Sequence, residues 1–408
     1  MTFRASRAIA VAALLAAIGP GCARRPPERD DLSERIDAAL AHAQGFLLSQ
    51  QSPDGAWRSR TYGAMRDGPS LTPAACKFLA FHPSLDESGA AALARGRDYI
   101  ARMLRPDGSS EPDGGALLYP VYTAALSAIV LGQSAEPEHA RASRSWLTLL
   151  REHRYGPHLG WRRADATYGG WGYAPRPFPK DAAREGFEGE ANLSSTLFAV
   201  GALRMSGLGA DDPVCRDALA FACRCQNFAE APALGDPAFD DGGFFFSPAD
   251  TLRNKTGAVR DRDGQERFPS YGSMTADGIR LLLRCGLPPD HPRVRAASSW
   301  LQAHFDPAHV PGRFAPDREF LRDATYYYYA WSCAHAFATL NLRTCDVADR
   351  RVDWAAALAS ELLSRQCEDG SWASPLGDSK EDDPLVATPL AAGALALCAR
   401  QMDTSAAR

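Results

Sequence analysis

An internal repeat constrains the fold of this chain more than any other feature of its sequence. Several short stretches can be aligned on one threonine, and each of them opens a run of small and apolar residues. The aligned residues are Thr72, Thr123, Thr196, Thr275 and Thr388, and a sixth stretch carries Tyr329 in the same place. Runs that are apolar nearly all round are typical of buried helices. The repeat therefore predicts six buried helices in series.

Between the buried runs lie stretches of a second kind, in which apolar residues recur at helical spacing among charges. They span about 33–50, 89–104, 137–151, 212–226, 291–304 and 349–366. Helices that alternate in this way bury their inner faces when neighbouring pairs stack around a ring. The sequence predicts an all-α fold, an (α/α)6 toroid barrel of six outer and six inner helices. We expect no sheet beyond short hairpins, and we expect the first and sixth inner helices to be neighbours.

The connections between the predicted helices differ in length. Those from inner to outer helices are short, whereas those from outer to inner helices are long and aromatic, above all about 152–190 and 227–270. Because all inner helices run the same way, every long loop lies at one end of the barrel. The amino ends of the inner helices point to that end and favour an anion there. This end is the expected mouth of a site, unless the loops only plug the barrel.

The first residues predict export. Arg4 and Arg7 precede an apolar run, 8–18, that is too short to span a bilayer and is typical of a signal sequence. Gly21 and Cys22 resemble a bacterial lipoprotein cleavage site, at which Cys22 would be lipidated; ordinary cleavage after Ala23 is the alternative. The expected organisation is an export signal over 1–22, a linker over 23–32 and one toroid domain over 33–402. The protein would be periplasmic or lipid-anchored to a bacterial membrane, with membrane contact only through the anchor.

Charge and cysteine content exclude several classes of partner. With 45 Lys and Arg against 49 Asp and Glu, the net charge is −4, so no basic excess favours nucleic acid as a partner. Most of the ten cysteines stand singly in apolar helical stretches, and no C-x-x-C pair occurs. We interpret them as small core residues, with one or two disulfides as the alternative. The sequence indicates no metal site and no cofactor.

A second repeat lies at the ends of the outer helices. It reads Gln51-Ser-Pro-Asp-Gly-Ala-Trp57 near the start and Gln366-Cys-Glu-Asp-Gly-Ser-Trp372 near the end, with degenerate copies at 105–108, 169–173 and 240–244. This pattern resembles the QxxDGxW repeat of squalene/oxidosqualene cyclases and the related repeats of protein prenyltransferase β-subunits. The resemblance covers essentially the whole mature chain and implies the α/α toroid. Asp-Gly suits the turn that leaves the outer helix, so we expect these Gln and Trp residues to hold the fold together.

The catalytic motifs of those relatives are absent or incomplete. Class II cyclases protonate an alkene with an aspartate of a D-x-D-D motif, and the nearest string here is Lys380-Glu-Asp-Asp383. Asp382 and Asp383 are therefore candidate acids, or simply charges at the start of a helix. Prenyltransferases bind zinc through an Asp-x-Cys and a later His. In this chain 277–279 is Asp-Gly-Ile, and no His opens the fifth or sixth inner helix.

The remaining candidates are residues that are unusual in a buried helix. Asp277 is a carboxylate inside an apolar run, so it must be paired, near water or functional, and it is the third candidate for catalysis. Six aromatic residues could line a ligand cavity, or could merely fill the barrel: Tyr271, Tyr326, Tyr328, Trp331, Trp171 and Tyr173. Ring faces of this kind stabilise cations, as terpene cyclases require.

Together these features indicate an exported protein with squalene cyclase/prenyltransferase-type repeats. We expect it to bind an extended apolar, isoprenoid-like ligand in a central cavity, and we leave catalysis open. A lipid or another small molecule is the expected partner. Two alternatives remain: a non-catalytic binding or scaffold lipoprotein, and a periplasmic carbohydrate-active α/α-toroid enzyme with facing carboxylates.

Overall fold

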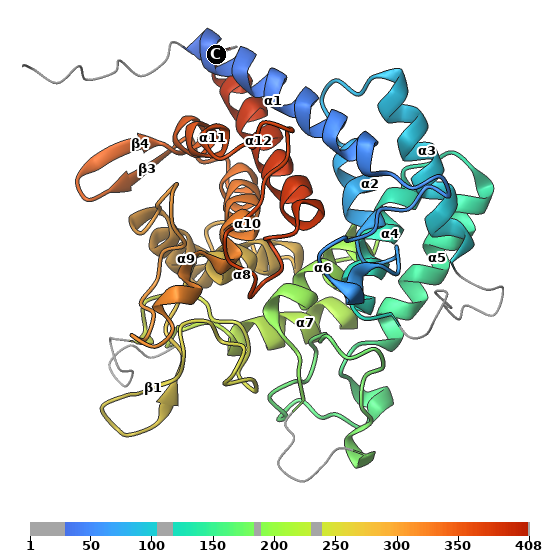
Figure 1. Cartoon of the computed structure of the whole chain (residues 1–408). Coiled ribbons are helices and arrows are strands. Elements are labelled where there is room, and N and C mark those ends of the chain that lie inside the picture. The colour runs from blue at the N-terminus through green and yellow to red at the C-terminus, as the bar shows by residue number, and fades with distance from the viewer. Residues whose placement is uncertain (1–28, 104–116, 183–188, 230–238, 407–408) are drawn as a thin grey trace, which may run out of the picture.

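The helices alternate between an outer and an inner layer along the whole chain (Figure 1). The computed structural model describes residues 29–103, 117–182, 189–229 and 239–406. The outer helices are α1 (Arg29–Gln50), α3 (Glu87–Arg102), α5 (Pro137–Glu152), α7 (Pro213–Arg224), α9 (Pro292–Ala303) and α11 (Trp354–Ser364). The inner helices are α2 (Thr72–Ala80), α4 (Pro120–Gly132), α6 (Leu193–Met205), α8 (Gly272–Arg284), α10 (Tyr326–Thr339) and α12 (Pro384–Ala406).

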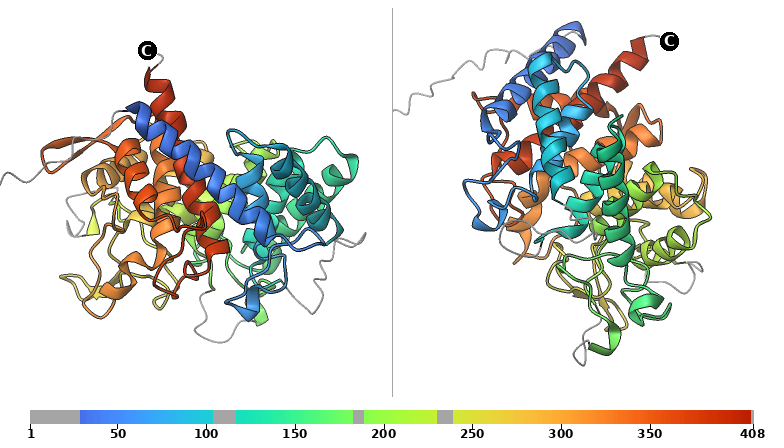
Figure 2. Two further views of the ribbon diagram at one scale, coloured as in Figure 1. Left: turned by 45° about the horizontal axis from the view of Figure 1, so that its top comes forward. Right: turned by 90° about the vertical axis from the view of Figure 1, so that its right-hand side faces the viewer.

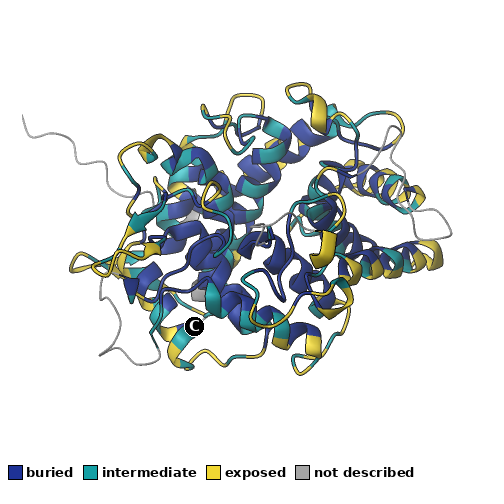
Figure 3. Cartoon of the chain, turned by 90° about the horizontal axis from the view of Figure 1, so that it is seen from below, coloured by how far each residue is buried: buried dark blue, intermediate teal, exposed yellow. Residues whose placement is uncertain are grey.

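The inner helices form a closed ring. Each contacts the next in chain order, and α12 returns to contact α2. At this seam the outer helix α1 also lies against α11 and α12, and the views of Figure 2 show α1 and α12 side by side. Figure 3 shows buried residues gathered on the inner helices and exposed ones toward the periphery. The predicted all-α toroid is confirmed, with the first and sixth inner helices as neighbours.

The described copies of the QxxDGxW repeat fasten an outer helix to the next one, as the first copy shows. The Gln51 amide donates to the carbonyl of Gly55 at 3.0 Å and to that of Ala92 in α3 at 2.8 Å. Gly55 has φ +96°, and a side chain there would meet the carbonyl of Arg95, so glycine is required. The motif thus joins α1 to α3 through main-chain contacts.

The last copy of the motif closes the ring. The Gln366 amide donates at 2.9 Å to the carbonyl of Gly370 and at 2.9 Å to that of Ala39 in α1. Gly370, with φ +87°, packs against the main chain of His42 in the same helix. The first and last outer helices are therefore joined by the same contacts that join α1 to α3.

The aligned threonines receive hydrogen bonds from these motifs. The backbone N–H of Trp57 donates to Thr72 Oγ1 at 2.9 Å, and that of Trp372 donates to Thr388 Oγ1 at 3.1 Å. The same bond joins Trp171 to Thr196 and Phe244 to Thr275. The two repeats recognised in the sequence are thus the two sides of one hydrogen-bonded junction between motif and inner helix.

Some boundaries differ from the prediction. Helix α1 begins at Arg29, so residues 29–32 belong to it and not to the linker. The sixth outer helix begins at Trp354 and not at 349, because a hairpin of β3 (Thr344–Val347) and β4 (Arg350–Asp353) precedes it. Asp353 ends the hairpin and caps α11 by accepting from the N–H of Ala356 at 3.1 Å.

The other regular elements are short. A second antiparallel hairpin pairs β1 (Val259–Arg260) with β2 (Glu266–Arg267). The connections that the structure describes contain the 3-10 helices η1 (Gly63–Met65), η2 (Pro157–Leu159), η3 (Lys180–Ala182) and η6 (Glu319–Thr325). The predicted export signal, the lipidation site Cys22 and the motif copy at 105–108 lie outside the described residues.

Two sequence features are explained by the closed ring. The cysteines that the structure describes are all free thiols, and most are buried, in line with the core interpretation and not with disulfides. Helix α12 is, by length and composition, apolar enough to cross a membrane over 384–403. It is nevertheless the sixth inner helix of the ring, and most of this segment is buried there.

Candidate functional site

Four inner helices, α2, α4, α10 and α12, keep one partly exposed face, whereas α6 and α8 are buried over most of their length. On α4, Tyr122, Leu126 and Ile129 keep partial exposure between fully buried residues. On α12, Val386 and Leu390 do the same, and Leu397 continues the series. Spacings of three, four and seven residues place these side chains on one face of each helix. Because the other faces are packed, this face points to the axis of the ring, which we call the lumen.

An aromatic cluster lies along the lumen. It consists of Tyr122 from α4, Phe198 from α6, Tyr328 and Trp331 from α10, and Tyr173 and Phe246 from the long loops. The rings of Tyr122 and Phe198 are 4.8 Å apart, and those of Phe198 and Trp331 are 5.5 Å apart. Contacts of this kind make a continuous aromatic surface. The long loops thus contribute side chains to the lumen as well as covering its end.

Asp277 stands within a buried polar network beside this cluster. Its side chain is 0% exposed. The Tyr328 hydroxyl donates to Oδ2 at 2.6 Å, and the Ser332 hydroxyl donates to Oδ1. The Arg280 guanidinium, one turn further along α8, lies 3.5 Å from Oδ1. Three donors from α8 and α10 therefore surround the carboxylate.

The network continues across the lumen. The Tyr328 hydroxyl is also hydrogen-bonded to Ser194 at 2.7 Å, and Ser194 is hydrogen-bonded to the Tyr122 hydroxyl at 2.7 Å. The chain of hydroxyls thus links α10, α6 and α4 to the Asp277 carboxylate on α8. Such a network fixes the relative positions of four inner helices.

The electrostatics favour Asp277 as an acceptor of hydrogen bonds. Burial raises the pKa of Asp277 to about 6, against the opposing effects of Arg280 and the Ser332 and Tyr328 hydroxyls. The group is therefore ionised near neutral pH. An acid that protonates an alkene must present a proton to it, whereas both oxygens of Asp277 receive hydrogen bonds.

The two other candidate acids have local structural roles. Asp382 accepts from the Tyr62 hydroxyl at 2.5 Å. Asp383 caps α12 by accepting from the N–H of Leu385 at 2.9 Å, and it also accepts from the Ser59 hydroxyl. The contact of Asp383 with Leu385 is that of a charge at a helix start, whereas the contact of Asp382 is with a loop tyrosine.

Their neighbour Glu381 was not singled out by the sequence analysis. It is buried, and its two oxygens accept from the backbone N–H groups of Tyr327 at 2.8 Å and Tyr328 at 2.9 Å, in the first turn of α10. Burial raises the pKa of Glu381 to about 8. The acidic string 380–383 was the available signal, but only the fold shows which of its carboxylates is buried against another helix.

The six aromatic candidates divide into two groups. Tyr328, Trp331 and Tyr173 belong to the lumen cluster. Tyr271 ends the loop before α8, is fully buried and packs against Phe314 of a connecting loop at 6.1 Å. Its ring contact is therefore with the layer of loops.

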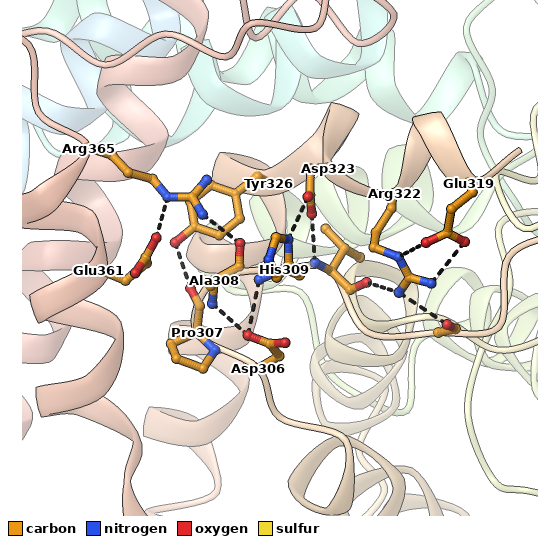
Figure 4. Close-up of polar contacts among 12 residues, drawn as sticks. Asp306, Pro307, Ala308, His309, Glu319, Arg322, Asp323, Tyr326, Glu361 and Arg365 are labelled. Carbon is orange, nitrogen blue, oxygen red and sulfur yellow. Dashed lines mark hydrogen bonds and ion pairs between the residues drawn. The ribbon is translucent and has the colours of Figure 1, made fainter. Parts of the chain in front are cut away.

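Trp171 and Tyr326 make their contacts with outer elements and not with the lumen cluster. The Trp171 indole donates at 2.6 Å to the carbonyl of Leu150 in α5, as the other motif tryptophans do with their outer helices. Tyr326 donates to the carbonyl of Pro307 at 2.7 Å, and the Arg365 guanidinium lies 3.7 Å from the centre of its ring (Figure 4). Residues two apart on a helix do not share a face, so Tyr326 and Tyr328 point to different sides of α10.

At the opposite end from the long loops lies a basic cavity of about 340 Å³. It is formed by the carboxyl-terminal halves of α6, α8 and α10 and is lined by Gly201, Arg204, Met205, Arg280, Leu283, Arg284, His335 and Thr339. The sequence pointed to a site at the other end, and these residues were not predicted from it. Their signal was the presence of Lys77, Arg280 and Arg284 within runs otherwise suited to a buried core.

Trp331 contacts residues of both the aromatic cluster and the basic cavity. The Arg280 guanidinium lies 4.3 Å from the centre of its indole, and the Lys77 ammonium lies 4.7 Å from it. His335, one turn further along α10, meets the same indole edge-on at 4.8 Å. Trp331 also packs against Phe198 and Tyr328. Within the described ranges of the chain, no group of three or more His, Cys, Asp or Glu is arranged to hold a metal ion.

The sequence matches no known family model and no curated protein. Solved structures are similar in fold. Type II terpene cyclase MstE from Scytonema, in complex with geranylgeranyl dihydroxybenzoate, has 14% identity and a TM-score of 0.56, over 91% of this chain and 99% of that one. Cellobiose 2-epimerase from Spirochaeta thermophila has 14% identity and a TM-score of 0.57, over 95% and 100%. The fold is thus a terpene cyclase-like α/α toroid, shared with an epimerase and not particular to squalene cyclases.

Proposed function

We propose that this protein binds an extended apolar, isoprenoid-like ligand in the lumen of the barrel. The observation that carries the proposal is the partly exposed apolar face of α4 and α12, beside the aromatic cluster to which Tyr122 of α4 belongs, in the interior of a closed ring. Ligand pockets are concave and mostly apolar, with few polar groups to fix orientation. The structure of MstE with geranylgeranyl dihydroxybenzoate supports the choice of ligand class, because that toroid takes up an isoprenoid chain.

The proposed activity is binding, without cyclisation started by alkene protonation. No D-x-D-D motif occurs in the sequence. Asp382 and Asp383 are engaged with Tyr62, Ser59 and the start of α12. Asp277 accepts hydrogen bonds on both oxygens beside a guanidinium. The carboxylates near the lumen thus hold structure in place and are poor donors of a proton to carbon.

A lumen-blocking variant tests the proposal. Geranylgeraniol is titrated into the protein while tryptophan fluorescence is followed, and Leu126→Trp is compared with Leu147→Trp on the outer helix α5. Leu126 faces the lumen, so its replacement should weaken binding about tenfold or more, while the α5 variant should bind as the wild type does. Lipids that co-purify with the native protein are identified by mass spectrometry as a second readout.

Two results would reject the proposal. Unfolding caused by Leu126→Trp would show that the lumen is packed like a core. Binding of cello-oligosaccharides but not of geranylgeraniol would favour the carbohydrate-active alternative, for which the fold likeness to cellobiose 2-epimerase is the available support.

We further infer that the chain is exported and that Cys22 carries a lipid anchor, on the basis of the charged and apolar stretches over 1–22. Mass spectrometry of the amino-terminal peptide should show a lipid-modified Cys22. A Cys22→Ala variant should then leave the membrane fraction. An amino terminus at Arg24 would instead show ordinary cleavage.

A further inference from the structure

The basic cavity contains more positive charge than its surroundings compensate. Arg204, Arg280 and Arg284 line it, and no carboxylate is among its lining residues. Arg280 is 4% exposed and is paired with Asp277 at 3.5 Å. Asp277 also accepts from Tyr328 and Ser332. Its charge is therefore engaged with Arg280 and these hydroxyls and does not compensate the other cations.

Among the described residues, the other cations have only carbonyl groups and aromatic rings as partners. Arg204 donates to the carbonyl of Leu208. The Arg284 guanidinium donates to the carbonyl of Leu197 at 3.2 Å, and it rests against Gly201 of α6, where a side chain would displace it. Within the described part of the chain, the Lys77 ammonium makes neither a hydrogen bond nor an ion pair and contacts aromatic rings alone. Burying cations in this way is unfavourable unless an anion joins them.

The pKa values of the basic groups are consistent with this uncompensated positive charge. Burial, together with the charges of Arg280 and Arg284, lowers the pKa of Lys77 to about 7. Burial and Arg280 lower the pKa of Arg284 to about 9. His335 has a pKa well below its usual value, because it is buried and because Arg280, Lys77 and Arg284 are near. At neutral pH its ring is therefore neutral and offers one N–H donor.

We propose that this cavity is a binding site for a phosphate-type oxyanion, held by the guanidinium groups of Arg284 and Arg204 with His335 as a neutral donor and Lys77 close behind. Guanidinium groups match the geometry of phosphate oxygens and form charge-assisted hydrogen bonds with them. The volume of about 340 Å³ lies in the range of small-molecule sites. Met205 and Leu283 add an apolar edge beside the charges.

The oxyanion has two sources with the same chemistry, a free phosphate and the head group of an amphiphile. Trp331 separates the cavity from the aromatic cluster, and its indole contacts groups on both sides. An amphiphile could therefore place its phosphate among the arginines and its chain along the apolar surface. The anion site does not depend on the proposed lumen ligand, because it rests on the charges of the cavity alone.

Calorimetric titration at pH 7 and low salt tests the site with three probes: inorganic phosphate, dodecyl phosphate below its micellar concentration, and dodecanol. We expect phosphate or dodecyl phosphate to bind. Arg284→Gln and Lys77→Met should each weaken that binding about tenfold, the loss expected for one charge-assisted contact. Arg144→Gln, which removes an equal charge from the exposed face of α5, should leave affinity unchanged. Thermal melting verifies that each variant is folded.

The outcomes separate the two sources and the two proposals. Binding of inorganic phosphate indicates a free anion, and binding of dodecyl phosphate alone indicates a head group; either supports the site. The proposal is overturned if neither phosphate probe binds, if both cavity variants bind like the wild type, or if dodecanol binds as tightly as dodecyl phosphate. Geranylgeraniol binding without phosphate binding would retain the lumen ligand and reject the anion site.

Discussion

The two halves of the lumen treat buried charge in opposite ways. In the half near the long loops, the Asp277 carboxylate is met by two hydroxyl donors and one guanidinium. In the half at the carboxyl ends of the inner helices, Lys77 and Arg284 stand without a carboxylate partner among the described residues. The first arrangement is complete in the protein itself, whereas the second is complete only with an anion from outside.

A single helix carries both arrangements. Asp277, Arg280 and Arg284 follow one another on α8 at spacings of three and four residues, so they share its lumen face. Arg280 belongs to both halves, since it is bound to Asp277 and Ser332 and also lines the cavity. Removing charge should therefore destabilise the protein beside Asp277 and stabilise it in the basic half of the lumen, and the following predictions test this contrast.

The largest effect is expected for Asp277→Asn. The variant keeps the shape of the side chain, but an NH2 group replaces an oxygen that accepts from a hydroxyl, and the Arg280 guanidinium loses its partner. Together these changes cost about 3–5 kcal/mol. Urea denaturation should show this loss in the free energy of unfolding. Asp382→Asn, at a partly exposed carboxylate, serves as a control and should cost less. A wild-type midpoint for Asp277→Asn would show that the network contributes no stability.

A pair of leucines on α12 tests whether the lumen is open. Leu395 is 0% exposed and belongs to the core, so Leu395→Ala should cost about 2–5 kcal/mol. Leu390 faces the lumen with partial exposure, so Leu390→Ala should cost about 1 kcal/mol or less. Thermal or urea unfolding compares them. Equal losses would mean that the lumen is filled as tightly as the core.

The contrast between the halves also separates what sequence could predict from what it could not. The toroid followed from the aligned threonines and the QxxDGxW motifs, because both mark the same junction, as in the bond from Trp57 to Thr72. Asp277 could be noticed because a carboxylate is unusual in an apolar run. Its partners Tyr328 and Ser332 lie on another helix, and only the closure of the ring brings them to it.

The site residues that the sequence did not place depend on the direction in which a side chain points. Tyr326 and Tyr328 are two residues apart, and a repeat aligned on Tyr329 does not tell which of them faces the lumen. The basic cavity depends on the meeting of α6, α8 and α10, which are separate in sequence. Its charged residues, moreover, resemble the usual basic residues at helix carboxyl ends.

At the basic end, removing a charge should raise the free energy of unfolding and not lower it. Lys77→Met removes a buried charge that lacks a partner and replaces it with an apolar chain of similar length, so the free energy of unfolding at pH 7 should rise by about 1–3 kcal/mol. The lowered pKa of Lys77 means that the unfolded chain binds more protons than the folded protein between about pH 7 and 10.5. The loss of stability caused by the buried Lys77 charge is therefore present in full below about pH 7 and disappears as the pH approaches 10.5.

Urea denaturation of both proteins at pH 6.5 and pH 9.5 measures this prediction. The advantage of Lys77→Met should be larger at the lower pH. A destabilised variant at both values would show that Lys77 has a partner that stabilises its charge, which would remove the difference between the two halves.

The smallest effect is expected for Tyr328→Phe, which removes one hydroxyl and keeps the ring among Phe198 and Trp331. Loss of the bond to Asp277 should cost about 1 kcal/mol near neutral pH. This hydroxyl lowers the pKa of Asp277 against the effect of burial, so the pKa should rise in the variant. Because that pKa is already raised, the folded protein binds more protons than the unfolded chain between about pH 4 and 6, and the contribution of Asp277 to stability falls as pH rises. In the variant this fall extends to higher pH, so its loss of stability relative to the wild type should be larger at pH 7 than at pH 4.5, where the carboxyl is mostly protonated in both proteins.

Urea midpoints at the two pH values measure the difference. Tyr326→Phe, whose hydroxyl bonds to Pro307, is the matched control and should show no such dependence. An equal deficit at both pH values would mean that the hydroxyl acts through Ser194 and not through the charge of Asp277.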